Sequence, residues 1–416
     1  MVESSERRGA LLDGVRVLEC ALLSANGVGQ HLADLGAEVI KVERPGEGDY
    51  GRRVGWPIID GVSLEHWHWN RGKRSIAIDL RSGDGASVFA AIAAVCDIVI
   101  EGMRPGALDR LGVGYDALRS RNERVVWCQI TGYGDSGPYR DIPSHGLAFD
   151  SMAGIAPPLV NADGLPSIPP HTSIGFHAGP LFAAFGAVSA VLRARETGQG
   201  CRIEVAQSDA AVAWNWLKVE GEVAYERPGE EVTGNFADGV GPRRVIGFDD
   251  FDDAVRYQYY ASHDGHVLLM ASERKFFRNF CDAVGRPDLY DAHPGGEVAE
   301  HAVGNRVLRR ELAAIFATRT TAQWMALAAD RDLPIAPVYD AAAARHDAHT
   351  ASRLRWLPRA EHGADLIATP VNATPHPLPA PTRAPTVGEH TDDILRSVLG
   401  CDEDQIAALR ATGAVA

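Results

Sequence analysis

The stretch VRVLECALLSANGVGQHLADLGAEVIKVERPGEGD, residues 15–49, decides the fold. It opens with a short apolar run, Val15–Leu18, of the kind found in buried strands. Val28–Leu35 then places apolar residues at helical spacing. A second strand is predicted at Glu38–Glu43, where the turn Arg44-Pro45-Gly46 ends it. Strand, helix and strand in this order predict a βαβ unit.

The same order of elements recurs downstream. A strand at Ser75–Leu80, a helix at Asp84–Val95 and a strand at Asp97–Glu101 form a second unit, and a further strand is predicted at Val125–Thr131. Strands that alternate with helices make a mostly parallel sheet, and such sheets bind ligands beyond the carboxyl ends of their strands. The fold class is therefore α/β, with a ligand site expected at the turns that follow the strands.

The remaining chain divides into segments of different composition. Strands at Tyr257–Ser262 and Val267–Met270 suggest a hairpin, followed by helices, and prolines crowd between Pro370 and Pro385. We predict four parts: the first part of a large domain at 1–214, a connector at 215–251, a small α+β domain at 252–330, and at 331–416 a strap that returns to the large domain.

Composition excludes several classes of protein. The 416 residues contain 41 Lys and Arg against 55 Asp and Glu, a net charge of −14, and no basic block, so nucleic acid is not an expected partner. The six cysteines are scattered without metal-ligand spacing, so we expect free thiols, no metal site and a cytoplasmic protein. The apolar stretch Leu181–Leu192 carries closely spaced Ala and Gly, which favours a packed helix over a membrane span.

Six blocks of sequence resemble the class III CoA-transferase family, which includes formyl-CoA and carnitine CoA-transferases and the α-methylacyl-CoA racemases. They are LADLGAEVIKVERPGEGD at 32–49, NRGKRSIAIDL at 70–80, EGMRPGALDRLG at 101–112, GYGDSGPY at 132–139, RETGQG at 195–200 and APTVGEHTDDIL at 384–395. The resemblance implies a Rossmann-like large domain built from both chain ends, an inserted small domain and an interlocked dimer. It also implies acyl-CoA and carboxylic acids as small-molecule partners, with no tightly bound cofactor.

CoA places phosphates at one end and a thioester at the other, so an acidic protein needs local cations and glycine turns to bind it. The predicted strands and turns supply both, and we expect the cations to share one rim of the sheet. The predicted CoA-binding residues are Lys41, Arg44, Lys73, Arg74, Arg104 and Arg110, with apolar walls from Met103, Leu111 and Tyr133 and a turn at Gly134.

The reactive residue departs from the family pattern. In the transferases an aspartate carboxylate attacks the thioester carbonyl. Counting back from the RETGQG block places Phe176 at that position, and phenylalanine is no nucleophile. His145 and His177 are the predicted proton-transfer groups. Asp163 is predicted to be an ordinary turn residue, and the connector carboxylates Glu220, Glu222 and Glu226 could reach a site in a partner subunit.

Several functions remain open at this point. The leading prediction is CoA transfer between carboxylic acids by a homodimer. One alternative is an acyl-CoA racemase or isomerase that uses His145 as its base. Another is a non-catalytic subunit, lacking the aspartate because of Phe176, in a heteromer with an Asp-bearing paralogue. The remaining hypothesis is a protein that binds CoA esters without turning them over.

Overall fold

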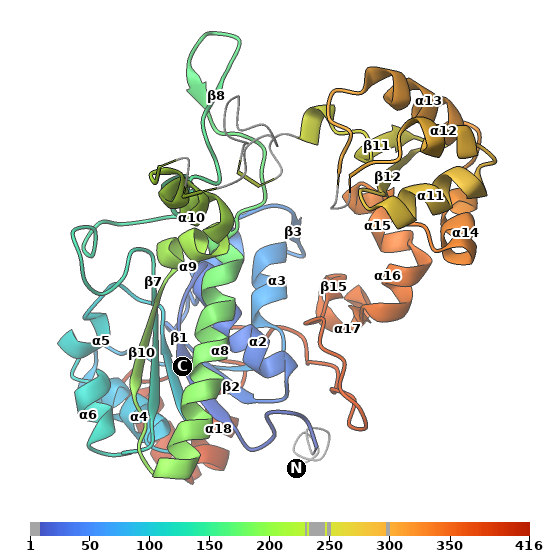
Figure 1. The fold of residues 1–416 in the computed structure, drawn as a ribbon. Helices are drawn as coiled ribbons and strands as arrows, with labels where there is room; N and C mark the ends of the chain where they lie inside the picture. The colour runs from blue at the N-terminus through green and yellow to red at the C-terminus, as the bar shows by residue number, and fades with distance from the viewer. Residues whose placement is uncertain (1–8, 229–230, 233–245, 248–250, 297–299) are drawn as a thin grey trace. The chain divides into compact units, whose positions relative to one another are not determined.

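The structure is a computed structural model that describes residues 9–228, 231–232, 246–247, 251–296 and 300–416. The chain forms two compact units, which Figure 1 shows as ribbons. The first unit consists of Met1–Asn215 together with Ser352–Ala416, and the second is Trp216–Ala351. Both ends of the chain therefore belong to the first unit.

A six-stranded parallel sheet forms the centre of the first unit, with strand order β10-β7-β6-β1-β2-β5. The strands are β1 (Arg16–Cys20), β2 (Glu38–Glu43), β5 (Lys73–Ala77), β6 (Ile98–Glu101), β7 (Val126–Thr131) and β10 (Arg202–Ala206). The predicted α/β class and parallel sheet are confirmed. Strand β10 was not predicted, because it is a half-exposed edge strand whose charged residues conceal its apolar pattern.

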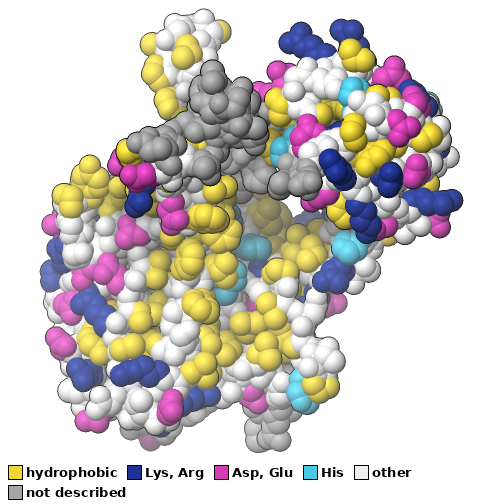
Figure 2. Space-filling model, viewed as in Figure 1, with side chains coloured by type: hydrophobic (Ala, Val, Ile, Leu, Met, Phe, Trp, Pro, Cys, Tyr) yellow, Lys and Arg dark blue, Asp and Glu magenta, His cyan; other side chains and the backbone are white. Residues whose placement is uncertain are grey.

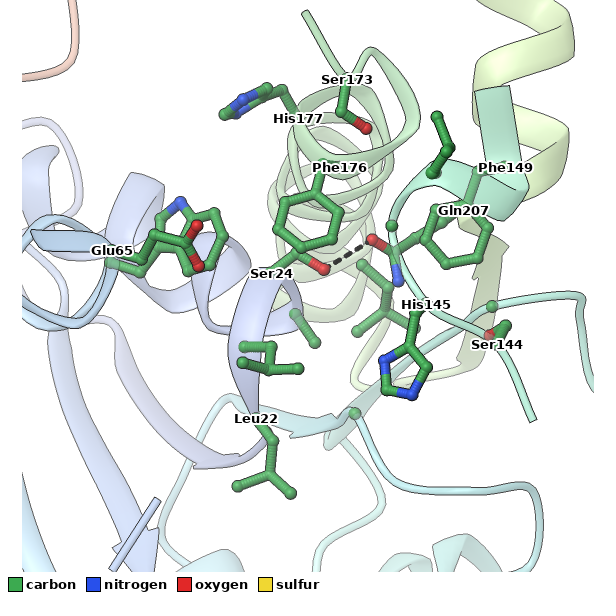
Figure 3. A pocket seen from close by; sticks show the side chains of 18 of the residues that line it. Leu22, Ser24, Glu65, Ser144, His145, Phe149, Ser173, Phe176, His177 and Gln207 are labelled. Carbon is green, nitrogen blue, oxygen red and sulfur yellow. Dashed lines mark hydrogen bonds between the residues drawn. The ribbon is translucent and has the colours of Figure 1, made fainter. Parts of the chain in front are cut away.

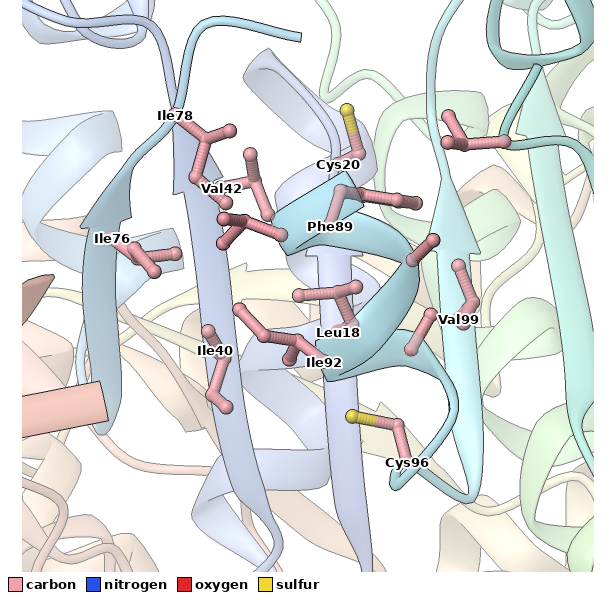
Figure 4. Close-up of a cluster of buried hydrophobic side chains, with 14 of the residues drawn as sticks. Leu18, Cys20, Ile40, Val42, Ile76, Ile78, Phe89, Ile92, Cys96 and Val99 are labelled. Carbon is pink, nitrogen blue, oxygen red and sulfur yellow. The ribbon is translucent and has the colours of Figure 1, made fainter. Parts of the chain in front are cut away.

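Helices cover both faces of this sheet. Successive strand residues point to opposite faces, so Leu18 packs with Phe89 and Ile92 on one side (Figure 4), while Val17 packs with Leu32 on the other. The first face is covered by α4 (Gly83–Ala93), α5 (Ala107–Arg110), α6 (Tyr115–Arg119), α18 (Thr391–Leu399) and α19 (Glu403–Ala411), and the second by α2 (Asn26–Asp34) and α8 (Gly175–Thr197).

Helix α8 is longer than the predicted segment Leu181–Leu192. Its alanines at 183, 184, 187 and 190 are buried against the sheet, which brings the helix axis close to the strands. Among the described residues, α8 is the one helix long and apolar enough to cross a membrane, and half of its most apolar window is buried inside the molecule. This burial fits a core helix.

Short elements surround the carboxyl ends of the strands. They are η1 (Leu23–Ala25), η2 (Tyr50–Arg53), α3 (Leu64–Asn70), α7 (Leu147–Met152), α9 (Gln207–Trp214), α17 (Arg359–His362) and the paired strands β3 (Ile58–Ile59) with β4 (Val62–Ser63), β8 (Leu159–Val160) with β9 (Pro166–Ser167), and β14 (Trp356–Leu357) with β15 (Leu366–Ile367).

The second unit contains a three-stranded antiparallel sheet around an aromatic core of Phe277, Phe280, Phe316 and Trp324. Its elements are α10 (Trp216–Tyr225), η3 (Phe251–Asp253), β11 (Tyr257–Ala261), β12 (His266–Met270), α11 (Arg274–Ala283), α12 (Pro287–Ala292), α13 (Arg306–Phe316), α14 (Thr321–Arg331), β13 (Ile335–Val338), α15 (Ala341–His346) and the start of α16 (Ala348–Arg353).

Two features of this unit differ from the predicted boundaries. Helix α10 occupies the start of the predicted connector at 215–251, where Gly and charged residues obscured its periodicity. Strand β13 lies beyond the predicted end at 330 because it pairs with β12, extending the hairpin to a third strand. The described part of the predicted connector is therefore largely helical.

Candidate functional site

A cavity of about 1610 Å³ opens at the carboxyl edge of the parallel sheet, within the first unit. Its walls come from the segments that follow β1, β2, β6 and β7 and from the starts of α3, α8 and α9 (Figure 3). The chain runs from β1 to β2 on one side and later returns through β6 on the other, so β1 and β6 bracket the point where strand order reverses. Ligands bind at such switch points in open α/β sheets.

A glycine lets the two loops at the switch point approach each other closely. Gly102 follows β6, and a Cβ placed there would lie 2.7 Å from the Cβ of Ala25 and 2.8 Å from that of Ala21. Those separations are closer than carbon atoms tolerate. The loops after β1 and β6 can therefore form one continuous wall only with glycine at this position.

Two arginines on one wall are available to a ligand. Arg104 and Arg110 line the cavity, are exposed, and form no ion pair with any described residue. Arg110 donates only a long bond, 3.4 Å, to the carbonyl of Pro105. Met103 and Tyr133, which the sequence predicts as apolar walls of the site, line the same cavity. Unpaired guanidinium groups beside apolar walls suit a ligand that carries phosphates.

The other predicted cations do not share this rim. Lys41 is fully buried and donates to Asp49 at 3.0 Å and to Asn26 at 2.7 Å. Lys73 is equally buried and donates to Glu19 at 2.5 Å. Both lysines tie strands to the loops beneath the cavity, so the expectation that they would touch CoA phosphates is corrected. Burial lowers the pKa of Lys73 to about 8, although Glu19 opposes that shift.

Arg74 and Arg44 are also held in ion pairs outside the cavity. Arg74 bridges Glu38 and Asp393, the latter at 2.5 Å, and so fastens α18 to the sheet. Arg44 pairs with Glu47 at 3.1 Å in an exposed turn. The predicted rim of six cations is therefore reduced to two.

Leu111 and Gly134, the remaining predicted CoA contacts, do not line the cavity. Leu111 packs against the hydrophobic core beneath α5. Gly134 forms the turn after β7, with φ of +93°, and its N–H donates to Thr131 Oγ1 at 2.8 Å. Its role is to shape the turn that carries Tyr133.

Phe176 lies in the first turn of α8 and lines the cavity. Its ring centroid is 5.4 Å from that of Trp69. On its other side the chain passes so near that a Cβ at Gly146 would lie 2.5 Å from the ring. The aromatic side chain therefore occupies a closely fitted place in the cavity wall.

The start of α8 is fixed by a buried carboxylate. Asp150 on α7 accepts the N–H groups of Ile174 at 3.1 Å and Gly175 at 2.8 Å, and the hydroxyl of Ser173 at 2.7 Å. It also lies 3.2 Å from His171 Nε2. The first N–H groups of a helix need such acceptors, so Asp150 determines where Phe176 and His177 sit.

His145 and His177, the predicted proton-transfer groups, both line the cavity. Burial lowers the pKa of His177, with Asp150 acting in the opposite direction. His68 lines it too, and burial lowers its pKa to about 3, so this imidazole stays neutral near pH 7. His145 and His177 lie on different sides of Phe176 (Figure 3).

Other predicted carboxylates lie elsewhere. Asp163 is in the exposed turn between β8 and β9, as expected for a turn residue. Glu220 and Glu222 lie on α10, and Glu226 follows it, all in the second unit. Among the described residues, no group of three or more His, Cys, Asp or Glu is placed to hold a metal ion.

The sequence analysis missed many of the residues that line the cavity, and Ser24, Gln207 and Glu65 are polar examples. Ser24 donates to Gln207 Oε1 at 2.8 Å, a buried bond shown dashed in Figure 3. Glu65 on α3 also lines the cavity, and burial raises the pKa of its carboxyl. None lies in a recognised block. No element was predicted at Glu65 or Gln207, so the sequence contained no signal for either residue.

A doubly wound parallel sheet with a cavity at its switch point and unpaired arginines on one wall defines an α/β protein that binds a phosphate-bearing small molecule. The chain belongs to CoA-transferase family III, whose family model matches residues 12–391. The resemblance drawn from the six sequence blocks is confirmed.

Known relatives are similar over nearly the full length. The beta subunit of succinyl-CoA–L-malate CoA-transferase from Chloroflexus aurantiacus is 29% identical over 409 residues, which are 96% of this chain and 96% of that one. Succinyl-CoA:glutarate CoA-transferase from Mus musculus is 28% identical and aligns with 97% of this chain and 90% of its own. A solved CAIB/BAIF family protein from Brucella suis superposes with a TM-score of 0.74 at 26% identity, covering 94% of this chain and 99% of that one.

Proposed function

We propose that this chain binds acyl-CoA thioesters and transfers CoA between carboxylic acids. Its family and its relatives, which are named as CoA-transferases acting on succinyl-CoA, support this activity. The observation that carries the proposal is the cavity at the switch point, with two unpaired arginines on one wall and a separate polar group around Phe176. One end suits phosphates and the other a reacting acyl group.

CoA is proposed to lie along the wall formed by the loops after β1 and β6. Arg104 and Arg110 would hold its phosphates, while Met103 and Tyr133 would contact the adenine and the pantetheine arm. The thioester would then reach the region of Phe176 and His145. This enzyme would need no tightly bound cofactor, because the CoA ester is itself the substrate.

The assembly is proposed to be an interlocked dimer, either of this chain or with an Asp-bearing paralogue, in which the second unit serves as the small α+β domain. Large apolar side chains gather over α8 and α9 on the exposed face of the first unit (Figure 2). The exposed residues there are Leu181, Phe182, Phe185, Leu192 and Trp214. A subunit interface would cover a patch of this kind, which supports the proposed assembly. The enzyme is proposed to be cytoplasmic.

A second candidate function is a subunit that relies on a partner for its nucleophile. The specific observation is Phe176, which lines the cavity where the family resemblance implies an aspartate. An isomerase is the other candidate, because His145 and His177 flank the same ring in the cavity. Proton removal from an α-carbon needs an acid and a base but no covalent adduct.

One experiment separates the three functions. The purified chain is incubated with succinyl-CoA and L-malate, glutarate or oxalate, and the CoA esters are separated by chromatography. A new CoA ester that requires the acceptor acid supports transfer. Deuterium at the α-carbon in D2O without an acceptor supports the isomerase. Activity that appears only after an Asp-bearing paralogue is added supports the heteromer.

A further inference from the structure

The cavity wall contains three carboxylates, and two of them are already engaged. Asp141 pairs with Arg140 at 2.9 Å, and its side chain is 84% exposed. Asp365 accepts the backbone N–H of Arg359 at 3.2 Å. The third, Glu65, forms no hydrogen bond or ion pair through its side chain with any described residue. A half-buried carboxylate without a partner is unusual, since lost hydration normally has to be compensated.

Glu65 lies on the same wall as Phe176. Helix α3 begins after Ser63, whose hydroxyl accepts the N–H of His66 at 3.0 Å and so fixes the first turn. Residues four apart lie on one face of a helix, so Glu65 and Trp69 share a face. Trp69 is the residue whose ring packs on Phe176, and Figure 3 draws the Glu65 carboxylate and the Phe176 ring in the same cavity.

The chain leaves space around this carboxylate. Gly55, which has φ of +89°, passes beside it, and a Cβ at that position would lie 3.0 Å from the carboxyl carbon and from Oε1 of Glu65. Any other residue at position 55 would press on the carboxylate and adopt a strained backbone. Burial also raises the pKa of the Glu65 carboxyl, which makes the anion less hydrated and a better nucleophile.

We propose that Glu65 is the carboxylate nucleophile of this chain, acting from α3 in place of the aspartate that the resemblance implies at position 176. This inference rests on the proposed transfer of CoA between acids. It explains how the first turn of α8 can carry an aromatic ring while the cavity retains a reactive carboxylate.

The chemistry balances without any further reagent. A Glu65 carboxylate oxygen attacks the thioester carbonyl carbon and the C–S bond breaks. CoA thiolate is expelled, and a mixed anhydride of Glu65 and the donor acyl group is formed. The thiolate attacks the Glu65 carbonyl of that anhydride, which releases the donor acid and leaves Glu65 as a CoA thioester. The acceptor carboxylate then attacks this thioester, and the released thiolate takes the acceptor acyl group and restores the free carboxylate.

Gln207 is placed to assist these steps. Because Ser24 donates to its Oε1, the amide Nε2 is left without a partner among the described residues and available to the cavity. An amide N–H that points at the developing oxyanion stabilises a tetrahedral intermediate. Gln207 would therefore donate a hydrogen bond to the oxyanion, while Glu65 forms and breaks the covalent bonds.

The test compares wild type with Glu65→Gln, with Glu47→Gln as a control glutamate outside the cavity, and with the double variant Glu65→Gln/Phe176→Asp. Transfer from succinyl-CoA is measured by chromatography, and CoA binding by calorimetry. After incubation with succinyl-CoA and no acceptor, hydroxylamine converts activated carboxyl groups to hydroxamates, which peptide mass spectrometry locates.

We expect Glu65→Gln to lower kcat by about 10³-fold or more, with CoA binding preserved and the hydroxamate at residue 65 lost. Glu47→Gln should match wild type, and the added aspartate should restore transfer to the double variant. Transfer that survives Glu65→Gln, a label on another residue, or simultaneous loss of CoA binding overturns the role of Glu65 and leaves the proposed function standing. A wild-type chain that binds CoA but neither transfers nor labels overturns both.

Discussion

Replacing Asp150 with alanine should destabilise the start of α8 and with it the chemical end of the cavity. The carboxylate is fully buried and accepts two backbone N–H groups and one hydroxyl. Alanine would leave these donors unsatisfied in a buried place, at a cost of about 1–3 kcal/mol for each group that water cannot reach. Allowing for partial hydration of the new space, we expect a loss of about 3 kcal/mol in the free energy of unfolding.

Urea unfolding followed by circular dichroism measures this loss. Asp150→Asn keeps one acceptor oxygen and should lose about 1 kcal/mol. Asp163→Ala, in an exposed turn outside the cavity, should change stability by less than about 0.5 kcal/mol. If Asp150→Ala and Asp163→Ala unfold at the same urea concentration, Asp150 does not hold α8 and the account of how Phe176 is positioned is refuted.

Three further outcomes are expected. Arg104→Ala should weaken CoA binding about 10-fold in calorimetry at low salt, whereas Arg44→Ala should not, and equal losses would contradict the assignment of the phosphate wall. Glu101→Gln should stabilise the fold at pH 8 by about 3 kcal/mol and hardly at all at pH 4.5. Burial raises the pKa of Glu101 from 4.5 to about 7. Between pH 4.5 and 7 the folded carboxyl therefore keeps a proton that the unfolded chain has lost, and the stability of the wild type falls as pH rises. Thermal melts in which the variant shows no pH-dependent gain in stability would contradict this prediction. Gly102→Ala should lower thermal stability by about 1–3 kcal/mol through contact with the loop after β1, and an unchanged melting temperature would show that the two loops can separate.

Local pattern was enough to predict most of the sheet. Glu38–Glu43 was predicted and observed with the same ends, because an apolar run bounded by Gly36 and a Pro-Gly turn leaves few alternatives. The start of α8 was missed because Gly175, Gly179 and Pro180 are poor helix formers. Buried packing and the acceptor on Asp150 override that preference, and neither is visible in the chain around residue 175.

The site was predicted less well than the fold, for a geometric reason. The sequence placed Lys41 correctly on a strand, whereas Lys73 lies at the start of β5, two residues before the predicted strand Ser75–Leu80. The sequence also does not show which acids face these lysines across the sheet. Glu19 is in register with Lys41 on the neighbouring strand. An acidic residue at that position of the sheet is a sign that buried lysines there form ion pairs inside the protein. Glu65 gave no signal because its importance depends on Trp69 meeting a ring more than 100 residues away.

The close fit between Gly146 and Phe176 limits which residues these two positions can accept. A bulky ring at one position forbids a side chain at the other, whereas a short acidic group there would lift the prohibition. Substitutions at the two positions should therefore be coupled, so that alanine at position 146 is tolerated better beside Phe176→Asp than beside the native ring. A residue larger than glycine at position 146 would instead displace the Phe176 ring from its present place in the cavity wall.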